Sequence, residues 1–117
     1  MKPTALITDV QRRQLLKNSE KSVGDALGEL MPVVKLHTLD AHATWLLVSL
    51  DPSDSDTAYG LIDLGLGAPE LGQVRLSDLS AIRGPNNIPV RPDPHFTARR
   101  TLSEYARQAK EDGSIND

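Results

Sequence analysis

The chain has 117 residues, of which 38% are hydrophobic, and a formal net charge of −3 at pH 7. This length predicts one domain over residues 1–117, because most domains contain about 100–150 residues. The absence of cysteine excludes thiol catalysis, disulfide frameworks and cysteine-ligated zinc sites, and the acidic balance disfavours broad binding to a phosphate backbone. No run approaches the ~20 apolar residues of a membrane span, so we expect a cytoplasmic protein with no membrane partner.

A helix is predicted near the N-terminus. Thr8 and Gln11 fit a capping box, in which each side chain accepts a hydrogen bond from the backbone amide of the other residue. This box predicts a helix over residues 9–18. Polar residues and two glycines between residues 18 and 31 then predict a loop, with a short helical turn after Ser22.

Four short strands are predicted in the middle of the chain, on the basis of β-branched and apolar residues. They cover residues 33–37, 43–50, 58–65 and 73–76. Their connections are too short for a helical crossover, so neighbouring strands should pair antiparallel. The second strand is apolar on both faces and belongs at the centre of the sheet. Its alternation places Trp45 and Leu47 on one face and Leu46, Val48 and Leu50 on the other.

Turn and breaker residues become frequent after the fourth strand. Ser77 is predicted to cap a short helix, which Gly84 and Pro85 end. Four prolines lie between residues 85 and 94. Because proline cannot donate a backbone hydrogen bond, residues 88–91 can form an edge strand at most.

A second helix is predicted near the C-terminus. Thr101 and Glu104 form another capping box, and Gly113 ends the helix that this box begins. The predicted fold class is therefore α+β: an antiparallel meander of three to four strands, with the N- and C-terminal helices packed on it. We expect both terminal helices to share one face of the sheet.

Charge is distributed unevenly along the chain. Residues 1–50 carry +1, residues 51–78 carry −5, residues 79–110 carry +4 and residues 111–117 carry −3. This pattern is compatible with two binding surfaces of opposite charge. The structural alternative, which we favour, is ordinary solvated surface and, for the basic stretch, a proline-stiffened arm laid over the domain with Phe96 tucked in. The predicted acidic surface consists of Asp51, Asp54, Asp56, Asp63 and Glu70. The predicted basic arm consists of Arg91, His95, Arg99 and Arg100, beside Phe96.

Asp63 interrupts an apolar strand, so its carboxylate should be partly buried and in need of donors or a cation. A functional role would be that of a general base or metal ligand. A structural role, which we favour, would be an ion pair with Arg75 on the adjacent strand, or hydrogen bonds from amides of the glycine-rich turn that follows.

Two groups of side chains have the chemistry of metal ligands. One is His37, Asp40 and His42, which bracket a predicted hairpin. The other is the three aspartates at residues 51–56, which lack the glycine and glutamate of a calcium loop. Turn chemistry is the favoured interpretation of both groups. No catalytic residue, metal or cofactor is predicted, since the chain also lacks a nucleophile elbow and a complete phosphate-binding loop.

Several segments together resemble a bacterial family of proteins of unknown function. They are residues 32–36 (PVVKL), 43–47 (ATWLL), 60–72 (GLIDLGLGAPELG) and 102–106 (LSEYA). The resemblance implies a small cytoplasmic protein encoded on plasmids, conjugative elements and phage-like islands, and it implies no catalytic residue. The chain departs from the family pattern mainly between residues 18 and 31.

Three functional hypotheses follow. The leading one is a non-enzymatic binding or regulatory accessory protein of mobile genetic elements, which engages a protein or nucleoprotein partner through its charged surfaces. Its sharper form is an inhibitor of a host defence complex. The second is a metal-dependent hydrolase or nuclease that uses Asp63 with Glu70, or the histidine group. The third is direct nucleic-acid binding through Arg91, Arg99 and Arg100, which is not favoured. The oligomeric state stays open.

Overall fold

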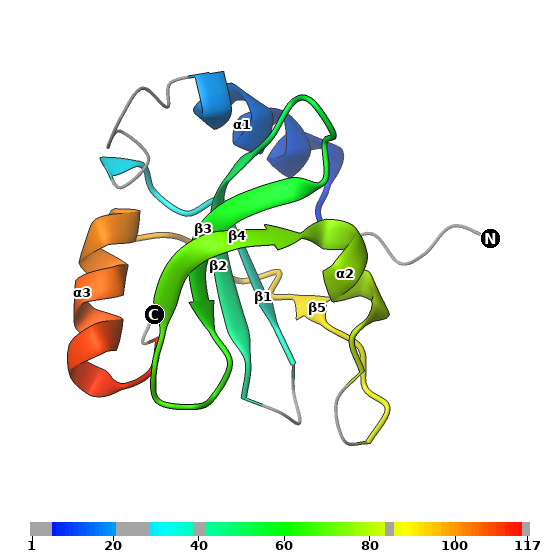
Figure 1. Cartoon of the computed structure of the whole chain (residues 1–117). Helices are drawn as coiled ribbons and strands as arrows, with labels where there is room; N and C mark the ends of the chain where they lie inside the picture. The colour runs from blue at the N-terminus through cyan, green and yellow to red at the C-terminus, as the bar shows by residue number, and fades with distance from the viewer. Residues whose placement is uncertain (1–5, 21–28, 39–41, 84–85, 116–117) are drawn as a thin grey trace.

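The computed structural model describes residues 6–20, 29–38, 42–83 and 86–115, which form one antiparallel sheet with three helices packed against it (Figure 1). The helices and strands are α1 (Asp9–Glu20), β1 (Val34–His37), β2 (Thr44–Leu50), β3 (Thr57–Asp63), β4 (Glu70–Arg75), α2 (Leu76–Ala81), β5 (Arg91–Pro92) and α3 (Leu102–Asp112). The predicted α+β class is confirmed. Among the described residues, no helix is long and apolar enough to cross a lipid bilayer.

The sheet has five strands in the order β4-β3-β2-β1-β5. The first four are sequential antiparallel neighbours, as expected for a meander. The fifth, β5, lies beyond the predicted three to four strands, although an edge strand was allowed for this proline-rich segment. It pairs with the outer side of β1 through Arg91 opposite His37 and Pro92 opposite Leu36. Because proline cannot donate a backbone hydrogen bond, a strand that contains it is short and lies at the edge of the sheet, as β5 does with its two residues.

The terminal helices cover opposite faces of the sheet, so the prediction that they share one face is wrong. Leu15 of α1 packs in a cluster with Trp45 and Leu47 of β2. Leu102 of α3 packs in a second cluster with Leu46. We call these sides the α1 face and the α3 face. A central strand that is apolar on both sides needs cover on both, and helices supply it on each side.

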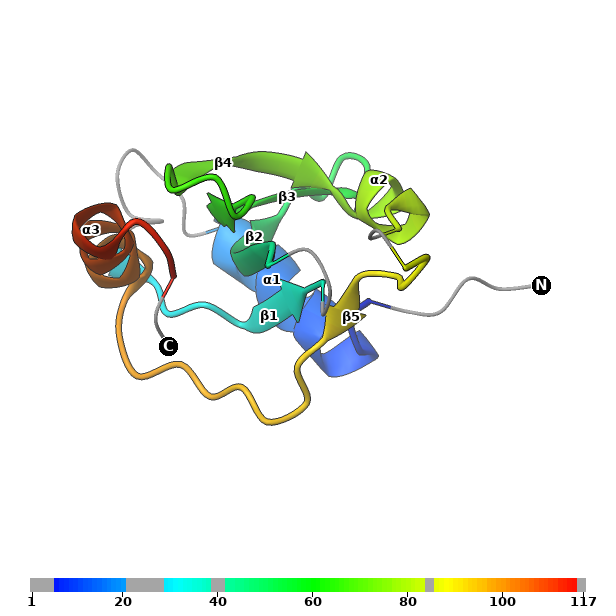
Figure 2. The same ribbon diagram turned by 90° about the horizontal axis from the view of Figure 1, so that it is seen from below.

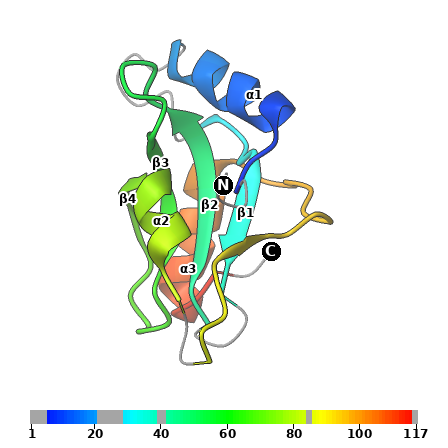
Figure 3. The same ribbon diagram turned by 90° about the vertical axis from the view of Figure 1, so that its right-hand side faces the viewer.

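The three helices occupy distinct places around the sheet. The α2 helix belongs to the α1 face, because Leu76 and Leu79 pack in the same cluster as Leu15. Figure 2 shows α2 and α3 on either side of the strands. Figure 3 shows α1 lying across one end of the sheet, next to β2. On the α3 face, helix α3 packs together with Leu30, Phe96 and Ile115 from segments outside the helices.

A β-bulge changes the faces of the central strand. The register between β2 and β3 shifts between Leu47 and Ser49. As a result, Leu50 packs with Trp45 on the α1 face rather than with Leu46, contrary to the simple alternation. The side-chain amide of Asn18 in α1 donates a hydrogen bond of 2.8 Å to the carbonyl of Val48, within this bulge. A bulge leaves such a backbone group without a ladder partner, and Asn18 supplies one.

The two predicted capping boxes are confirmed. The backbone amide of Thr8 donates to Gln11 Oε1 at 2.8 Å, and the amide of Gln11 donates to Thr8 Oγ1 at 3.1 Å. Thr101 and Glu104 form the equivalent pair at the start of α3. That helix ends at Gly113, whose φ of 76° is the left-handed conformation that glycine favours.

The predicted cap of α2 is wrong. The N-cap residue is Arg75, which makes no side-chain cap, and the helix begins at Leu76. Ser77 instead donates its amide and its hydroxyl to the two carboxylate oxygens of Asp56, at 2.9 and 2.6 Å. Asp56, in the β2–β3 turn, thus accepts hydrogen bonds from the amide and the hydroxyl of Ser77 in the first turn of α2. The helical turn predicted after Ser22 lies outside the described residues.

Candidate functional site

The aspartates of the β2–β3 turn organise the backbone around them. Asp51 Oδ1 accepts a hydrogen bond of 2.8 Å from the amide of Ser53. Asp54 accepts from the amides of Asp56 and Thr57 and, at 2.6 Å, from the hydroxyl of Thr57. These are the local side-chain to backbone bonds that aspartate makes in turns.

Among the described acidic side chains, Asp54 has the pKa that departs furthest from its usual value. The hydrogen bond from the Thr57 hydroxyl, followed by the two backbone amides, lowers the pKa of Asp54 to about 2. Asp54 and Asp51 stay exposed to solvent. The turn therefore presents the Asp54 carboxylate in its ionised form at any pH above the acidic range.

Asp63 does not belong to the acidic surface. It is 3% exposed, and its two oxygens accept backbone amides from Gly65 at 2.8 Å and Ile115 at 3.1 Å. The predicted bond from the glycine-rich turn is confirmed. The predicted ion pair with Arg75 is wrong, because Arg75 pairs with Thr57 at the opposite end of β3. Asp63 thus ties the end of β3 to the turn and to the C-terminal segment.

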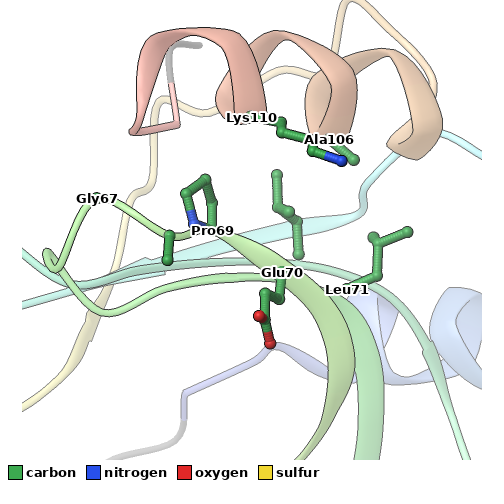
Figure 4. Close-up of a pocket in the computed structure, with 8 residues that line it drawn as sticks. Gly67, Pro69, Glu70, Leu71, Ala106 and Lys110 are labelled. Carbon is green, nitrogen blue, oxygen red and sulfur yellow. The ribbon is translucent and has the colours of Figure 1, made fainter.

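Glu70 and Asp63 point to opposite faces of the sheet. Glu70 stands opposite Ile62 in the β3–β4 register, and directly opposed residues share a face. Asp63 follows Ile62 in β3, so its side chain faces the other side. Figure 4 shows the Glu70 carboxylate on the side of β4 that is turned away from α3. The pair proposed for metal-dependent hydrolysis does not converge.

The histidine group is only partly described. His37 lies in β1 opposite Thr44, and His42 is exposed with a φ of 57°. Asp40 lies outside the described residues. Within the described ranges, no group of three or more histidine, aspartate or glutamate side chains is arranged to hold a metal ion.

The predicted basic arm lies over the domain. Asp93 anchors it, through an ion pair of 3.7 Å with Lys35 and a backbone hydrogen bond of 2.9 Å to the Lys35 carbonyl. The amide of His95 lowers the pKa of Asp93. Phe96 packs against the α3-face cluster, as the structural alternative expected. Figure 2 shows the arm running from β5 to α3.

The four residues predicted to form the basic arm are all exposed: Arg91, His95, Arg99 and Arg100. Two of them are tied to α3. The amide of Arg99 donates to the Tyr105 hydroxyl at 3.0 Å, and the guanidinium of Arg100 donates to Gln108. The basic arm is therefore a surface strap that ends at the C-terminal helix.

An open groove of about 490 Å³ lies between strand β4 and helix α3 (Figure 4). Its lining includes Leu61, Ala68, Pro69, Leu71, Ala106 and Lys110. We call it the β4–α3 groove. The groove was not predicted, because the predicted fourth strand begins at residue 73, after the residues of β4 that line the groove. Glu70 and Gly72, residue types that are uncommon in strands, hid the first half of β4.

Exposed leucines gather in the same stretch of chain. Leu64 is 55% exposed, Leu66 is 82% exposed and Leu71 is 43% exposed. Leu64 and Leu66 lie in the β3–β4 connection and Leu71 lies in β4, where it lines the groove. Single exposed leucines are ordinary, but three of them within eight residues, one of which lines an apolar groove, mark a candidate contact surface for another protein.

Comparisons with known proteins give a family without an assigned activity. No curated protein and no solved structure matches the chain significantly. The model of the family described as protein of unknown function (DUF2958) matches residues 6–116. The match spans both terminal helices, the whole sheet and the β4–α3 groove. The chain therefore belongs to the DUF2958 family of proteins of unknown function.

Proposed function

We propose that this protein is a non-enzymatic binding protein, which acts by holding a protein or nucleoprotein partner. The observation that carries the proposal is the open, mainly apolar β4–α3 groove with Leu71 half exposed in its wall. Covering apolar surface on association is favourable by roughly 25 cal/mol for each Å² removed from water. Leu64 and Leu66, in the connection that leads into β4, are also exposed.

The charged surfaces support the same proposal in a secondary role. Asp51 and Asp54 are exposed, and the low pKa of Asp54 keeps its carboxylate ionised at neutral pH. Such a cluster would attract a basic surface and accelerate encounter more than it strengthens the final complex. The groove, rather than the acidic turn, would hold the partner.

The setting that we propose is that of a mobile genetic element. The resemblance of the segments PVVKL, ATWLL and GLIDLGLGAPELG to a family found on plasmids and phage-like islands supports it. In its sharper form, the proposal is that the partner belongs to a host defence complex, which the protein inhibits by occupying it. The geometry of Asp63 favours binding over hydrolysis, since both of its oxygens accept backbone amides.

A cross-linked pull-down from the native host tests the proposal, with three baits compared by quantitative mass spectrometry. They are the wild-type chain, Leu71→Asp, which places a charge in the groove wall, and Val10→Asp as a matched control. Val10 is 73% exposed and lies in α1, on the other face of the sheet. We expect a discrete partner with the wild type and the control, and a loss of about tenfold or more with L71D.

Two results would contradict the proposal. One is that no protein is enriched over an unrelated bait of the same size and charge. The other is that L71D recovers the same proteins in the same amounts as the wild type, after circular dichroism has shown that it is folded. Because Leu71 is already half exposed, the substitution leaves the core clusters intact.

A further inference from the structure

The two edges of the sheet differ in how they are protected. At one edge, β5 is two residues long and contains Pro92, which has no amide hydrogen to offer. Short length and proline are means by which proteins prevent unwanted strand pairing. At the other edge, β4 is six residues long and contains no proline. No strand among the described residues pairs with its outer side.

The register identifies which residues of β4 point their backbone groups outward. The amide of Leu76, just after β4, donates to the carbonyl of Asp56 at 2.8 Å. Continuing the β3–β4 register by one step makes this a hydrogen-bonded pair. Because bonded and non-bonded pairs alternate in an antiparallel ladder, the backbone groups of Leu71, Gln73 and Arg75 face the free edge.

The side chains of these same residues face the groove side of the sheet. Leu71 stands opposite Leu61, and Gln73 stands opposite Tyr59. Both opposing residues pack in the α3-face cluster. A strand added beside β4 would therefore present every second side chain to the α3 face, where the flank of α3 with Ala106 and Lys110 meets it.

Lys110 determines the charge that suits this position. It is exposed in the groove wall and makes no hydrogen bond or ion pair with any described residue. The carboxylate of Glu70 cannot serve it, because that side chain points to the other face (Figure 4). A carboxylate brought by a partner would complete the pair, next to an apolar side chain that fills the space between Leu71 and Ala106.

We propose that β4 binds an extended segment of the partner protein as a sixth strand of the sheet. This segment carries an apolar side chain for the β4–α3 groove and, at an alternate position, an aspartate or glutamate for Lys110. The backbone groups of Leu71, Gln73 and Arg75 supply the main-chain hydrogen bonds, and the groove supplies selectivity, as in other complexes formed by strand addition. The inference rests on the proposed function, since it specifies how the partner is held.

Selection of phage-displayed random octapeptides on the immobilised full chain provides the probe. We expect enriched peptides with apolar and acidic residues at alternate positions. In the free protein, the amides of Leu71, Gln73 and Arg75 should exchange with solvent faster than those of Gly72 and Val74, which face β3. Adding a selected peptide should slow exchange at the first three and leave the other two unchanged.

Two substitutions at one position separate backbone from side-chain effects. Gln73→Pro removes the outward amide without removing a bond to β3, so it should fold and weaken peptide binding by about tenfold or more. Gln73→Ala keeps the amide and should bind within about twofold of the wild type. When the selection is repeated on the Lys110→Glu variant, peptides with acidic residues should no longer be enriched. If Q73P fails to fold, the hydrogen-exchange measurement on the wild type with and without peptide tests whether the peptide binds at the edge of β4.

Each contrary outcome has a distinct meaning. Strand addition is overturned if no peptide is enriched, or if a bound peptide leaves exchange at the three outward amides unchanged. It is also overturned if these amides are protected without peptide in a concentration-dependent way, because β4 is then occupied by a second copy. The proposed function survives all of these if the pull-down still depends on Leu71, and it fails independently if that dependence is absent.

Discussion

Gly60 is the residue at which one added atom would disturb the sheet most. It lies in β3 opposite Leu47, next to the bulge in β2. A Cβ atom on Gly60 would lie 1.9 Å from the backbone oxygen of Leu46 and 2.9 Å from the Cα of Leu47. Backbone atoms in the middle of a sheet cannot move aside, so only glycine fits here. A Cβ atom added to Gly72, its neighbour in β4, would contact only the flexible end of the Ile62 side chain, at 3.5 Å.

The two glycines give a matched pair of substitutions. Gly60→Ala should lower the free energy of unfolding by about 3 kcal/mol or prevent folding, because the clash must displace backbone. Gly72→Ala should leave the free energy of unfolding within about 1 kcal/mol of the wild type, since the space is open and alanine restricts the unfolded chain. Urea unfolding of both variants checks this, and equal midpoints would contradict the argument.

Helix α1 is attached to the sheet by few buried side chains. Within it, only Leu15 and Asn18 are buried. Asn18 donates to the Val48 carbonyl at 2.8 Å and accepts from the Gln14 amide at 2.8 Å. The bulge in β2 therefore determines where α1 docks, because the carbonyl that the bulge leaves free is the one that Asn18 satisfies. Such a polar contact inside an interface specifies one arrangement over others.

Removing the hydrogen bond between Asn18 and Val48 should lower the free energy of unfolding, although the substitution raises the helix propensity of α1. Asn18→Ala raises helix propensity but leaves the buried Val48 carbonyl without a donor. We expect a net loss of about 1–3 kcal/mol in the free energy of unfolding. Arg13→Ala is the control, because Arg13 is exposed in the same helix, and it should stay within about 0.5 kcal/mol. Chemical denaturation compares the two, and a stable N18A would show that Val48 finds another donor.

At the scale of the molecule, the described residues form one sheet between two apolar clusters. The strand β2 contributes Trp45 and Leu47 to the α1 face, and Leu46 and Val48 to the α3 face. Neither cluster can lose its packing without exposing the same central strand. Unfolding should therefore be a single cooperative event, as is usual for a domain of this size.

Substitutions on the two faces should act on one transition. Leu15→Ala on the α1 face and Leu102→Ala on the α3 face should each cost about 2–5 kcal/mol, because both residues are fully buried. The double variant should be additive within about 0.5 kcal/mol. Fluorescence of Trp45, the single tryptophan, reports on the α1 face. In L102A it should follow the same transition as far-ultraviolet circular dichroism, and separate transitions would contradict cooperativity.

The sequence by itself determined the features that depend on neighbours along the chain. Both capping boxes, the antiparallel pairing of β1 to β4 and the edge position of β5 follow from local hydrogen bonding, short connections and the chemistry of proline. It also indicated that Asp63 would be partly buried, and an amide of the turn that follows was one of the two structural partners it suggested. These interactions span few residues, so composition and spacing are enough to predict them.

Only the tertiary structure decided the features that join distant segments. Asp63 accepts its second hydrogen bond from Ile115, 52 residues further along the chain, and Asp56 satisfies the start of α2 across 21 residues. The placement of α1 and α3 on opposite faces, the bulge at Val48 and the β4–α3 groove arise in the same way. The physical reason is that burial and hydrogen-bond satisfaction depend on which surfaces meet in space, and a periodic pattern indicates that a face needs cover without indicating which element covers it.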